Sequence, residues 1–374
     1  MKVALVTDWL TSYAGSEKVE EAILGLFPEA DVYTCVYDKN AFKGTRFEQH
    51  DVRQSFIARL PRAIKHYQKY LPLMPLAIEQ LDMSGYDLVI SSSHAVAKGV
   101  ITGPDQLHIC YCHSPIRYAW DFQHQYLAES GMGKGLKGLI VKYLLHRLRT
   151  WDVRTAPGVD HFVANSAYIA RRIRKVYRRD ADVIHPNVAV DDFSVVSEKD
   201  DFYLAASRLV PYKRIALIVE AFTKMPDRKL VVIGSGEQKE QIKKILTPNI
   251  TFLGYQPFDV LKQYLEKAKA FVFAAEEDFG IMPIEAQACG TPVIAYGRGG
   301  ALETVQDGKT GILFREQNID GIINAVSRFE AEGVSCAPEK IRQHAETFSS
   351  QRFDDEFARY VRERWHAFQQ YRGF

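Results

Sequence analysis

The sequence predicts an α/β protein of two domains, each built around a parallel β-sheet. At 374 residues the chain is longer than a single hydrophobic core usually extends. Apolar, strand-like runs alternate with helix-like stretches along the whole chain, which is the pattern of parallel sheets. A polar segment without a clear period, Asp191 to Asp201, lies near the middle and is predicted to be the linker.

The strands are predicted from short apolar runs that are bounded by polar or glycine-containing loops. In the first half these runs are Lys2–Thr7, Ala30–Val36, Leu88–Ser91, Leu107–Cys112 and His161–Ala164. In the second half they are Tyr203–Ala206, Lys229–Ile233, Thr251–Phe252, Ala270–Ala274, Val293–Ala295 and Gly311–Phe314. The tail from Gln351 to Gln370 has apolar residues at mixed spacings of three and four, which predicts a final helix.

The composition is that of an ordinary globular protein, with 47% hydrophobic and 25% charged residues. No apolar run reaches 18 residues, so no membrane-spanning helix is expected. The first residues reach Asp8 too early for a secretory signal and instead predict a strand. Five cysteines without CxxC spacing indicate reduced thiols rather than disulfides or a zinc site. We therefore expect a cytoplasmic protein.

The charge is distributed unevenly along the chain. Residues 1–190 hold 24 Lys and Arg against 19 Asp and Glu, whereas the remainder holds 24 against 27. Two stretches in the first half, Val52–Lys69 and Gly131–Trp151, contain no acid at all. Basic amphipathic helices of this kind can lie on an anionic membrane surface, although they can equally be the solvated faces of ordinary helices. Nucleic-acid binding is disfavoured because no recognised nucleic-acid motif accompanies them.

Two acids, Glu277 and Glu285, flank a Phe-Gly-Ile turn directly after the apolar run that ends at Ala274. Glu277 is expected in the loop at the carboxyl end of a strand. Glu285 is expected one turn into a helix that is read from Pro283 onward. The backbone N–H groups of residues 280–282 would face outward at the start of this helix, where anions bind readily. The pattern favours a ligand that combines sugar hydroxyls with a diphosphate, although a lone pair of acids at this spacing also occurs by chance.

Two further loops are predicted at the same sheet edge in the second half. Arg208 and Lys213 follow a strand and could both reach one diphosphate, although a basic loop is often only surface. Gly234 and Gly236 follow the next strand and permit close backbone approach to a ligand. Two glycines without a third make a poor dinucleotide fingerprint, which argues against an oxidoreductase.

The first half contains two loops of the same kind. Gly15 begins a helix after the first strand, where its backbone could approach phosphate oxygens; a plain helix cap by Ser16 is the alternative. His113 ends a strand and precedes a proline-stiffened loop that carries the acceptor-binding candidates Arg117, Tyr118 and Trp120. Aromatic rings with a few polar groups are typical of a sugar-binding cleft.

These motifs together resemble a known family. The set Ser-Arg-Leu-x-Pro-x-Lys from 207, Gly-x-Gly from 234, Phe-Leu-Gly-Tyr from 252 and Glu-x7-Glu from 277 resembles retaining glycosyltransferases of family 4, which have the GT-B fold. The string from Tyr111 to Asp121 is similar to bacterial mannosyltransferases that build O-antigens and exopolysaccharides. The family's first loop often has two glycines, whereas Ala14 replaces one of them here.

The resemblance implies the domain organisation and the residue roles. It implies two Rossmann-like domains facing across a cleft: 1–190 for the acceptor, with the C-terminal helix 353–374 crossing back to it, and 200–350 for the nucleotide-sugar. His113, Arg208, Lys213 and Glu277 would be catalytic. The donor would contact Gly15, Gly234, Gly236, Tyr255, Gln256, Phe258, Phe279, Gly280, Ile281, Met282 and Glu285, with Glu285 on the ribose.

The function that the resemblance implies is retaining, metal-independent transfer of mannose from GDP-mannose to a lipid-linked glycan, without a cofactor, at the inner face of the plasma membrane. Asp180-Ala181-Asp182, the one Asp-x-Asp in the sequence, is read as a loop before a strand Val183–His185 and not as a metal site. A UDP-sugar transferase and a nucleotide-sugar epimerase of the same fold remain alternatives. A non-catalytic sugar-binding protein is a third, which the absence of a recognisable signal segment disfavours.

Overall fold

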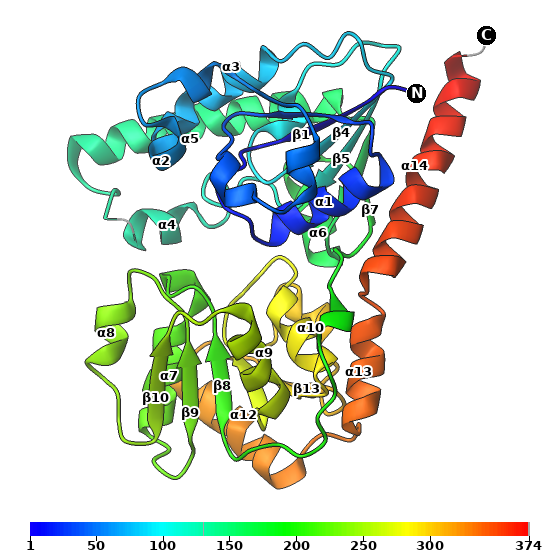
Figure 1. The fold of residues 1–374 in the computed structure, drawn as a ribbon. Coiled ribbons are helices and arrows are strands. Elements are labelled where there is room, and N and C mark those ends of the chain that lie inside the picture. The colour runs from blue at the N-terminus through cyan, green and yellow to red at the C-terminus, as the bar shows by residue number, and fades with distance from the viewer. Residues whose placement is uncertain (130, 373–374) are drawn as a thin grey trace. The chain divides into compact units, whose positions relative to one another are not determined.

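The computed structural model describes residues 1–129 and 131–372, and within it the chain divides into two compact units (Figure 1). The first comprises Met1–Asn187 together with the chain from Phe353 onward, and the second comprises Val188–Arg352. The predicted borders at 190 and 200 lie close to this division. The segment Asp191–Asp201, however, belongs to the second unit, where Phe193 is buried. The division at Asn187 therefore precedes the predicted linker.

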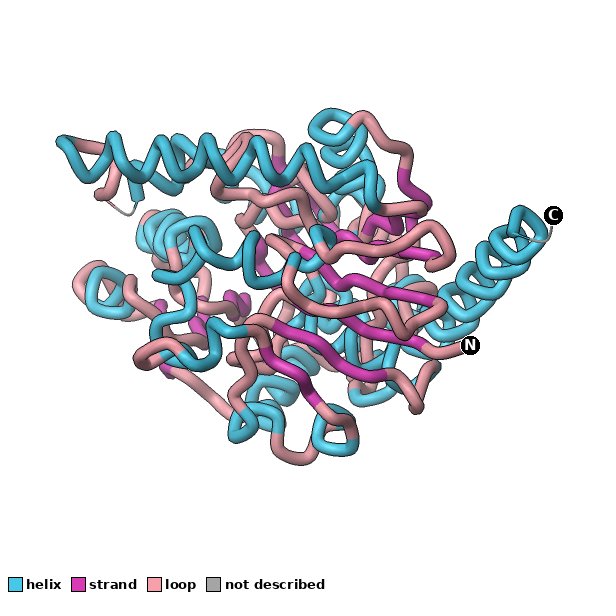
Figure 2. The backbone as a smooth tube through the Cα atoms, turned by 90° about the horizontal axis from the view of Figure 1, so that it is seen from above, coloured by secondary structure: helices cyan, strands magenta, loops and turns pink. Residues whose placement is uncertain are grey.

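The first unit is built on a seven-stranded parallel sheet with the order β3-β2-β1-β4-β5-β6-β7. The strands are β1 Val3–Thr7, β2 Asp31–Thr34, β3 Val52–Gln54, β4 Leu88–Ser93, β5 Leu107–Cys112, β6 His161–Ala164 and β7 Ala181–Val183. All residues of β1, β4 and β5 are buried, as expected for strands covered on both faces. In Figure 2 these strands lie side by side among the helices.

Helices cover both faces of this sheet. They are α1 Gly15–Leu26, α2 Ala63–His66, α3 Met74–Glu79, α4 Gln123–Glu129, α5 Gly135–Thr155, α6 Ala167–Tyr177 and α14 Ser350–Arg372. Leu5 and Ile90 point into a core that includes residues of α1 and α14. Their neighbours Ala4 and Val89 point into a second core with residues of α3 and α5. This alternation is the period of two that a β-strand imposes.

The second unit has a six-stranded parallel sheet with the order β10-β9-β8-β11-β12-β13. Its strands are β8 Tyr203–Ala206, β9 Leu230–Ile233, β10 Ile250–Gly254, β11 Ala270–Phe273, β12 Val293–Tyr296 and β13 Gly311–Phe314. Its helices are α7 Ile215–Thr223, α8 Lys239–Lys243, α9 Phe258–Lys267, α10 Ile281–Ala288, α11 Ala301–Thr304, α12 Ile319–Glu332 and α13 Pro338–Glu346. The predicted α/β class with two parallel sheets is therefore confirmed.

Two edge segments of the first unit differ from the prediction. Val52–Lys69 is not one basic helix: it contains strand β3, a 3-10 turn, the four-residue helix α2 and the start of a second 3-10 helix. Pro61 cannot donate the N–H that a continuing helix needs, and Arg62 has a left-handed φ of 53°. Ala181 and Asp182 are not in a loop either, because Ala181–Val183 pairs with Phe162–Ala164 as β7, whereas Asp180 precedes the strand. The prediction of a strand Val183–His185 was thus displaced by two residues.

The C-terminal helix α14 confirms the helix predicted over Gln351–Gln370. Phe353, Phe357, Tyr360 and Val361 are buried in the core of the first unit. Asp182 of β7 accepts hydrogen bonds from Tyr360 and from Arg364 of the same helix, both at 2.9 Å. The second aspartate of the Asp-x-Asp sequence therefore anchors the final helix.

All five cysteines are free thiols, as predicted. None of the described helices is both long and apolar enough to serve as a bilayer-spanning segment. Over residues 1–129 and 131–372, no group of three or more His, Cys, Asp or Glu side chains is placed to hold a metal ion.

Candidate functional site

In the second unit the candidate residues come from loops at the carboxyl ends of the strands, the edge where parallel sheets bind ligands. Glu277 lies in the loop between β11 and α10, as predicted. Helix α10 begins at Ile281, two residues before the predicted start, because Gly280 takes a left-handed φ of 89° and Pro283 fits within the first turn. Glu285 lies in the second turn of this helix and is 8% exposed.

Glu277 and Lys213 form an ion pair in which each side chain is 16% exposed. Lys213 ends the 3-10 helix Pro211–Lys213 that follows β8, whereas Glu277 follows β11, and these two strands are neighbours. The pair therefore brings an ammonium group and a carboxylate to one point. A ligand in which an anionic group is bonded to a hydroxyl-bearing group could displace this ion pair. Its anion would bind the ammonium group, and its hydroxyls would donate to the carboxylate.

A glycine pair, Gly299 and Gly300, fixes the Glu277 backbone. Gly300 donates its N–H to the Glu277 carbonyl at 2.8 Å, and Gly299 forms a parallel bridge with Glu277. A Cβ on Gly299 would lie 2.2 Å from the Glu277 carbonyl oxygen, and one on Gly300 would lie 2.3 Å from Phe279 Cα. Only residues without a side chain allow the two loops to approach this closely.

Tyr212 positions both predicted cations, and the sequence reading missed it. Arg208 is exposed and donates to the Tyr212 hydroxyl at 2.9 Å. Lys213 Nζ lies 5.4 Å from the centre of the Tyr212 ring, within range of a cation–π contact. The placement of a tyrosine between two spaced cations was the available signal in the sequence.

Gly234 and Gly236 are accounted for by packing, with φ angles of 148° and 154°. A Cβ on Gly234 would lie 1.9 Å from the Ser207 carbonyl oxygen, and one on Gly236 would lie 2.5 Å from the Leu209 carbonyl oxygen. These glycines therefore let the loop after β9 press against the loop that carries Arg208. Their direct contact with a ligand stays a prediction.

The remaining donor-side residues fall into two groups. Phe279 is 4% exposed and packs against Phe348, so its side chain belongs to the core and only its main chain could meet a ligand. Tyr255 and Phe258 are 75% and 46% exposed at the end of β10, where Gln256 donates to the Leu253 carbonyl at 2.9 Å. Three inter-strand steps separate β10 from β11, roughly 14 Å at the usual spacing.

In the first unit, His113 follows β5 and its Nε2 lies 2.8 Å from Ser92 Oγ. Burial, and then the neighbouring His94, lower the pKa of His113 to about 3. The imidazole is therefore neutral at physiological pH. Its ring contacts the ring of Tyr111 at 5.1 Å and that of His94 at 6.5 Å.

The Asp8–His94 pair beside His113 was not predicted. His94 Nδ1 lies 3.0 Å from Asp8 Oδ2, and Asp8 is buried. The Asp8 carboxylate also accepts the backbone N–H groups of residues 94–97 at 2.5–3.0 Å. Although burial opposes it, these contacts with His94 and the backbone lower the pKa of Asp8. The signal was a histidine directly after the strand neighbouring that of His113.

The other first-unit candidates are placed separately. Gly15 begins α1 as predicted, and Glu17 rather than Ser16 supplies the bond at the helix start, accepting from the Ala14 N–H at 2.9 Å. Arg117 stacks on Phe122 at 4.4 Å.

Trp120 has a structural engagement. Its Nε1 donates at 2.7 Å to Asp152, which forms a fully buried ion pair with Lys98 at 2.9 Å. The polar atom of the Trp120 side chain is therefore used within the fold.

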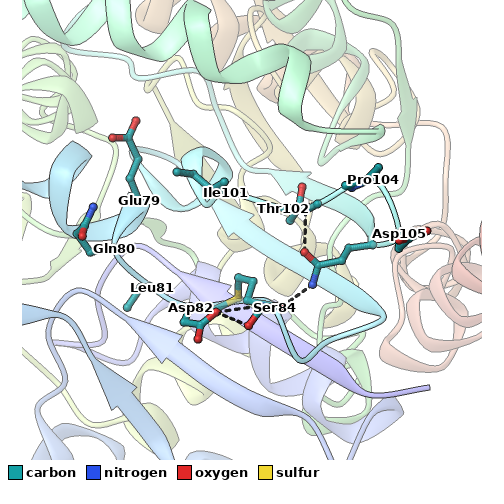
Figure 3. Close-up of a pocket in the computed structure, with 12 residues that line it drawn as sticks. Glu79, Gln80, Leu81, Asp82, Ser84, Ile101, Thr102, Pro104 and Asp105 are labelled. Atoms are coloured by element: carbon teal, nitrogen blue, oxygen red, sulfur yellow. Dashed lines mark hydrogen bonds between the residues drawn. The ribbon is translucent and has the colours of Figure 1, made fainter.

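A pocket of about 550 Å³ lies at the opposite edge of the first sheet, among residues that precede β4 and β5 (Figure 3). Gln106 crosses its wall, donating to the Tyr86 carbonyl at 2.7 Å and accepting from the Gly103 N–H at 2.7 Å. None of the predicted site residues lines it. Because it is at the amino ends of the strands, it is not the candidate site.

The second unit is similar to a known family of enzymes. Residues 190–348 match the family model described as glycosyl transferases group 1. D-inositol 3-phosphate glycosyltransferase from Mycobacterium sp. (strain KMS) is 27% identical over 51% of this chain and 49% of its own. A GDP-mannose-dependent alpha-(1-6)-phosphatidylinositol monomannoside mannosyltransferase from Mycolicibacterium smegmatis is 32% identical over 34% of this chain and 37% of its own. The chain spans about half the length or less of these curated relatives.

Solved structures share the fold over nearly the whole chain. Anabaena Alr3699/HepE in complex with UDP has a TM-score of 0.70 at 17% identity, covering 97% of this chain and 100% of its own. Sucrose-phosphate synthase from Thermosynechococcus elongatus has a TM-score of 0.75 at 18% identity, covering 98% and 100%. At these identities the likeness shows the fold, which is the predicted GT-B type with two Rossmann-like domains.

Proposed function

We propose that this chain, whose second unit matches the group 1 glycosyl transferases, transfers a sugar from a nucleotide-sugar to a glycan acceptor. The observation that carries the proposal is the Lys213–Glu277 ion pair at the ends of neighbouring strands β8 and β11. A nucleotide-sugar has a diphosphate bonded directly to a sugar. Its diphosphate can contact the Lys213 ammonium while its sugar hydroxyls contact the Glu277 carboxylate. One such ligand can therefore take over both contacts of the ion pair.

The extent of the candidate site supports an elongated donor. The exposed rings of Tyr255 and Phe258 follow β10, three strands away from the strand that precedes Glu277. A base near β10, a ribose at Glu285 and a diphosphate at Arg208 and Lys213 would span such a distance. We propose mannose as the sugar and GDP as the carrier, since the Mycolicibacterium smegmatis relative is described as GDP-mannose-dependent. A UDP-sugar is the second candidate, since the Anabaena structure was solved with UDP.

The chemistry that we propose is loss of the nucleoside diphosphate with retention at the sugar carbon. Arg208 and Lys213 would stabilise the charge that develops on the leaving diphosphate, together with the N–H groups of residues 280–282 at the start of α10. Glu277 would accept hydrogen bonds from the sugar hydroxyls. His113, which is neutral, would offer a polar contact to the sugar without adding charge. No metal or cofactor is needed for this charge stabilisation.

The acceptor that we propose is a lipid-linked glycan at the cytoplasmic face of the plasma membrane, bound by the first unit. Helix α5 supports this, because its side chains at 136, 139, 140 and 143 are 53–74% exposed. Apolar residues at this spacing form one stripe on a helix. Lys137 and Lys142 flank this stripe, and Lys134 directly precedes the helix. An exposed apolar stripe flanked by cations is typical of a helix that lies on an anionic bilayer.

The test is incubation of the purified protein with a panel of nucleotide-sugars, with thermal stability and transfer measured in parallel. GDP-mannose is expected to raise the melting temperature and to be turned over only when acceptor is present. Conversion of the donor alone into a second nucleotide-sugar would instead identify an epimerase. Protection by no nucleotide-sugar would contradict the proposal.

Glu285→Ala should abolish transfer while leaving the fold intact, because it removes the carboxylate proposed to bind the ribose. Glu332→Ala is the matched control, since Glu332 is an exposed acid near the end of α12. Near-normal turnover of Glu285→Ala would refute the ribose role.

A further inference from the structure

We propose that an apolar groove in the first unit binds the hydrocarbon chain of the phosphorylated lipid that carries the acceptor. The inference rests on the proposed function, because it assumes a lipid-linked acceptor and assigns a separate site to its lipid. The groove encloses about 320 Å³ between the segment before α3 and the helices α4 and α5. Its described lining residues are Trp9, Gln68, Leu71, Tyr118, Tyr126, Leu127, Met132, Val141 and Leu145.

The lining favours hydrocarbon over a glycan. Eight of the nine lining residues are aliphatic or aromatic, and Gln68 is the one amide among them. A sugar buried here would leave most of its hydroxyls without partners, whereas an alkyl or isoprenoid chain loses nothing polar. Tyr118 is the exception, because its hydroxyl is buried and has no hydrogen-bond partner in the described part of the chain. A phosphate oxygen at the head of the lipid would satisfy it.

Two lining residues relate the groove to the candidate site and to the exposed helix. The Trp9 ring meets the His94 ring edge-on at 4.7 Å, and His94 is the neighbour of His113. Met132 is 51% exposed just before the start of α5. A chain lying in the groove would therefore run from the site toward the helix that exposes an apolar stripe.

Two of the segments that form the groove walls are basic. These segments, residues 52–78 and 131–151, contain no acid. Their lysines at positions 65, 69, 134, 137 and 142 form no ion pair with any carboxylate among residues 1–129 and 131–372. Cations without carboxylate partners beside an apolar groove are what an anionic lipid requires. A neutral lipid would make no use of them.

The groove lies beside the histidines of the candidate site, through the contact of Trp9 with His94. A lipid phosphate bound on that side would be separated from the reacting hydroxyl by only a few sugars. This fits an acceptor whose glycan is still short. The reaction that supplies such a substrate is the transfer of a first sugar or sugar phosphate onto a lipid phosphate.

The test measures binding of decyl phosphate, below its micelle concentration, by titration calorimetry. Decyl phosphate should bind the wild-type protein, whereas inorganic phosphate and decanol should each bind at least 10-fold more weakly. Val141→Trp should weaken decyl phosphate binding at least 10-fold, because Val141 lines the groove and indole would fill it. Ile101→Trp is the matched control, since Ile101 is 61% exposed and lies outside the groove. Leu71→Trp fills the groove from the opposite wall and replaces Val141→Trp if that variant unfolds.

Several results would overturn the inference. These are equal decyl phosphate affinity in wild type and both groove variants, or saturation of the groove by methyl mannoside in place of decyl phosphate. Self-association that only the groove variants abolish, without decyl phosphate binding, would assign the groove to a second copy of the chain. GDP-mannose protection, measured on the same samples, reports on the proposed function separately. If GDP-mannose does not protect the wild-type protein, the proposed function is wrong. If GDP-mannose protects it but decyl phosphate does not bind, only the proposed lipid site is wrong.

Discussion

At the scale of the residue, an ion pair joins two side chains for which different roles were predicted. The sequence placed Lys213 on a diphosphate and Glu277 on sugar hydroxyls, and the structure pairs their charged groups directly. That contact could not be predicted, because the two residues lie 64 positions apart and only the pairing of β8 with β11 joins them. Trp120 illustrates the opposite case. Its aromatic ring suggested sugar binding, but its N–H is held by a buried aspartate that lies 32 positions along the chain.

Arg208→Ala should lower kcat by roughly 100-fold, the usual effect of removing one fixed donor that stabilises transition-state charge. Arg208 is exposed and its side chain donates to the Tyr212 hydroxyl near the surface, so the fold should tolerate the change. The measurement is steady-state kinetics, with Arg362→Ala on the exposed face of α14 as the control. An unchanged kcat with a raised KM would show that Arg208 only binds the ground state.

Two histidines with lowered pKa values predict a pH dependence of stability. Burial is the main cause that lowers the pKa of His108 to about 4 and that of His113 to about 3. Below pH 6.5 these two histidines bind protons in the unfolded chain but stay neutral in the folded chain. The free energy of unfolding should therefore fall as the pH drops from 6.5 toward 4. Above pH 6.5 these two histidines should contribute no pH dependence.

His108→Gln should reduce that slope by about 1.4 kcal/mol per pH unit, the contribution of one proton. The check is urea unfolding of wild type and variant between pH 4 and 7. Comparing the two chains removes the contribution of other titrating groups, including Glu20, whose burial raises its pKa. Parallel curves would contradict the prediction.

At the scale of the element, the sequence predicted the buried strands but not the exact edge strands of the first sheet. The strands β1, β5, β8 and β11 appear as continuous apolar runs because both faces are covered. The edge strands β3 and β7 have three residues each and no fully buried side chain. The apolar pattern therefore predicted no strand at β3 and placed the strand at β7 two residues too late. Their existence depends on hydrogen bonds to β2 and β6, which are tertiary contacts.

The exposed stripe of α5 makes a prediction at the same scale. Replacing Lys134, Lys137 and Lys142 together by Gln should weaken binding to vesicles containing anionic lipid by roughly 100-fold, at about 1 kcal/mol per lysine. The matched control replaces Lys239, Lys243 and Lys244 around α8 of the second unit. Vesicle sedimentation at low and high salt measures the effect. Equal losses in both triple variants would show a general charge effect instead of a membrane-binding face.

At the scale of the whole molecule, the last helix connects the end of the chain to its first unit. The sequence predicted a helix over this segment, and the resemblance implied its return, but which side chains enter the core needed the structure. Phe353 and Phe357 are fully buried and stack on each other at 5.5 Å, and both contact the Tyr111 ring of β5. The first unit therefore completes its core with residues from the far end of the sequence.

Phe357→Ala should lower the free energy of unfolding of the first unit by about 3–5 kcal/mol, because it leaves a cavity in a core that includes β1, β4 and β5. Phe222→Ala is the matched change in the core of the second unit, where Phe222 is equally buried. Hydrogen exchange resolves the two units: Phe357→Ala should reduce protection in β4 and β5 and spare β8 and β11, and Phe222→Ala should do the reverse. If each variant lowered protection equally in both sheets, the units would unfold as one cooperative body, and the final helix would stabilise the whole chain instead of its first unit.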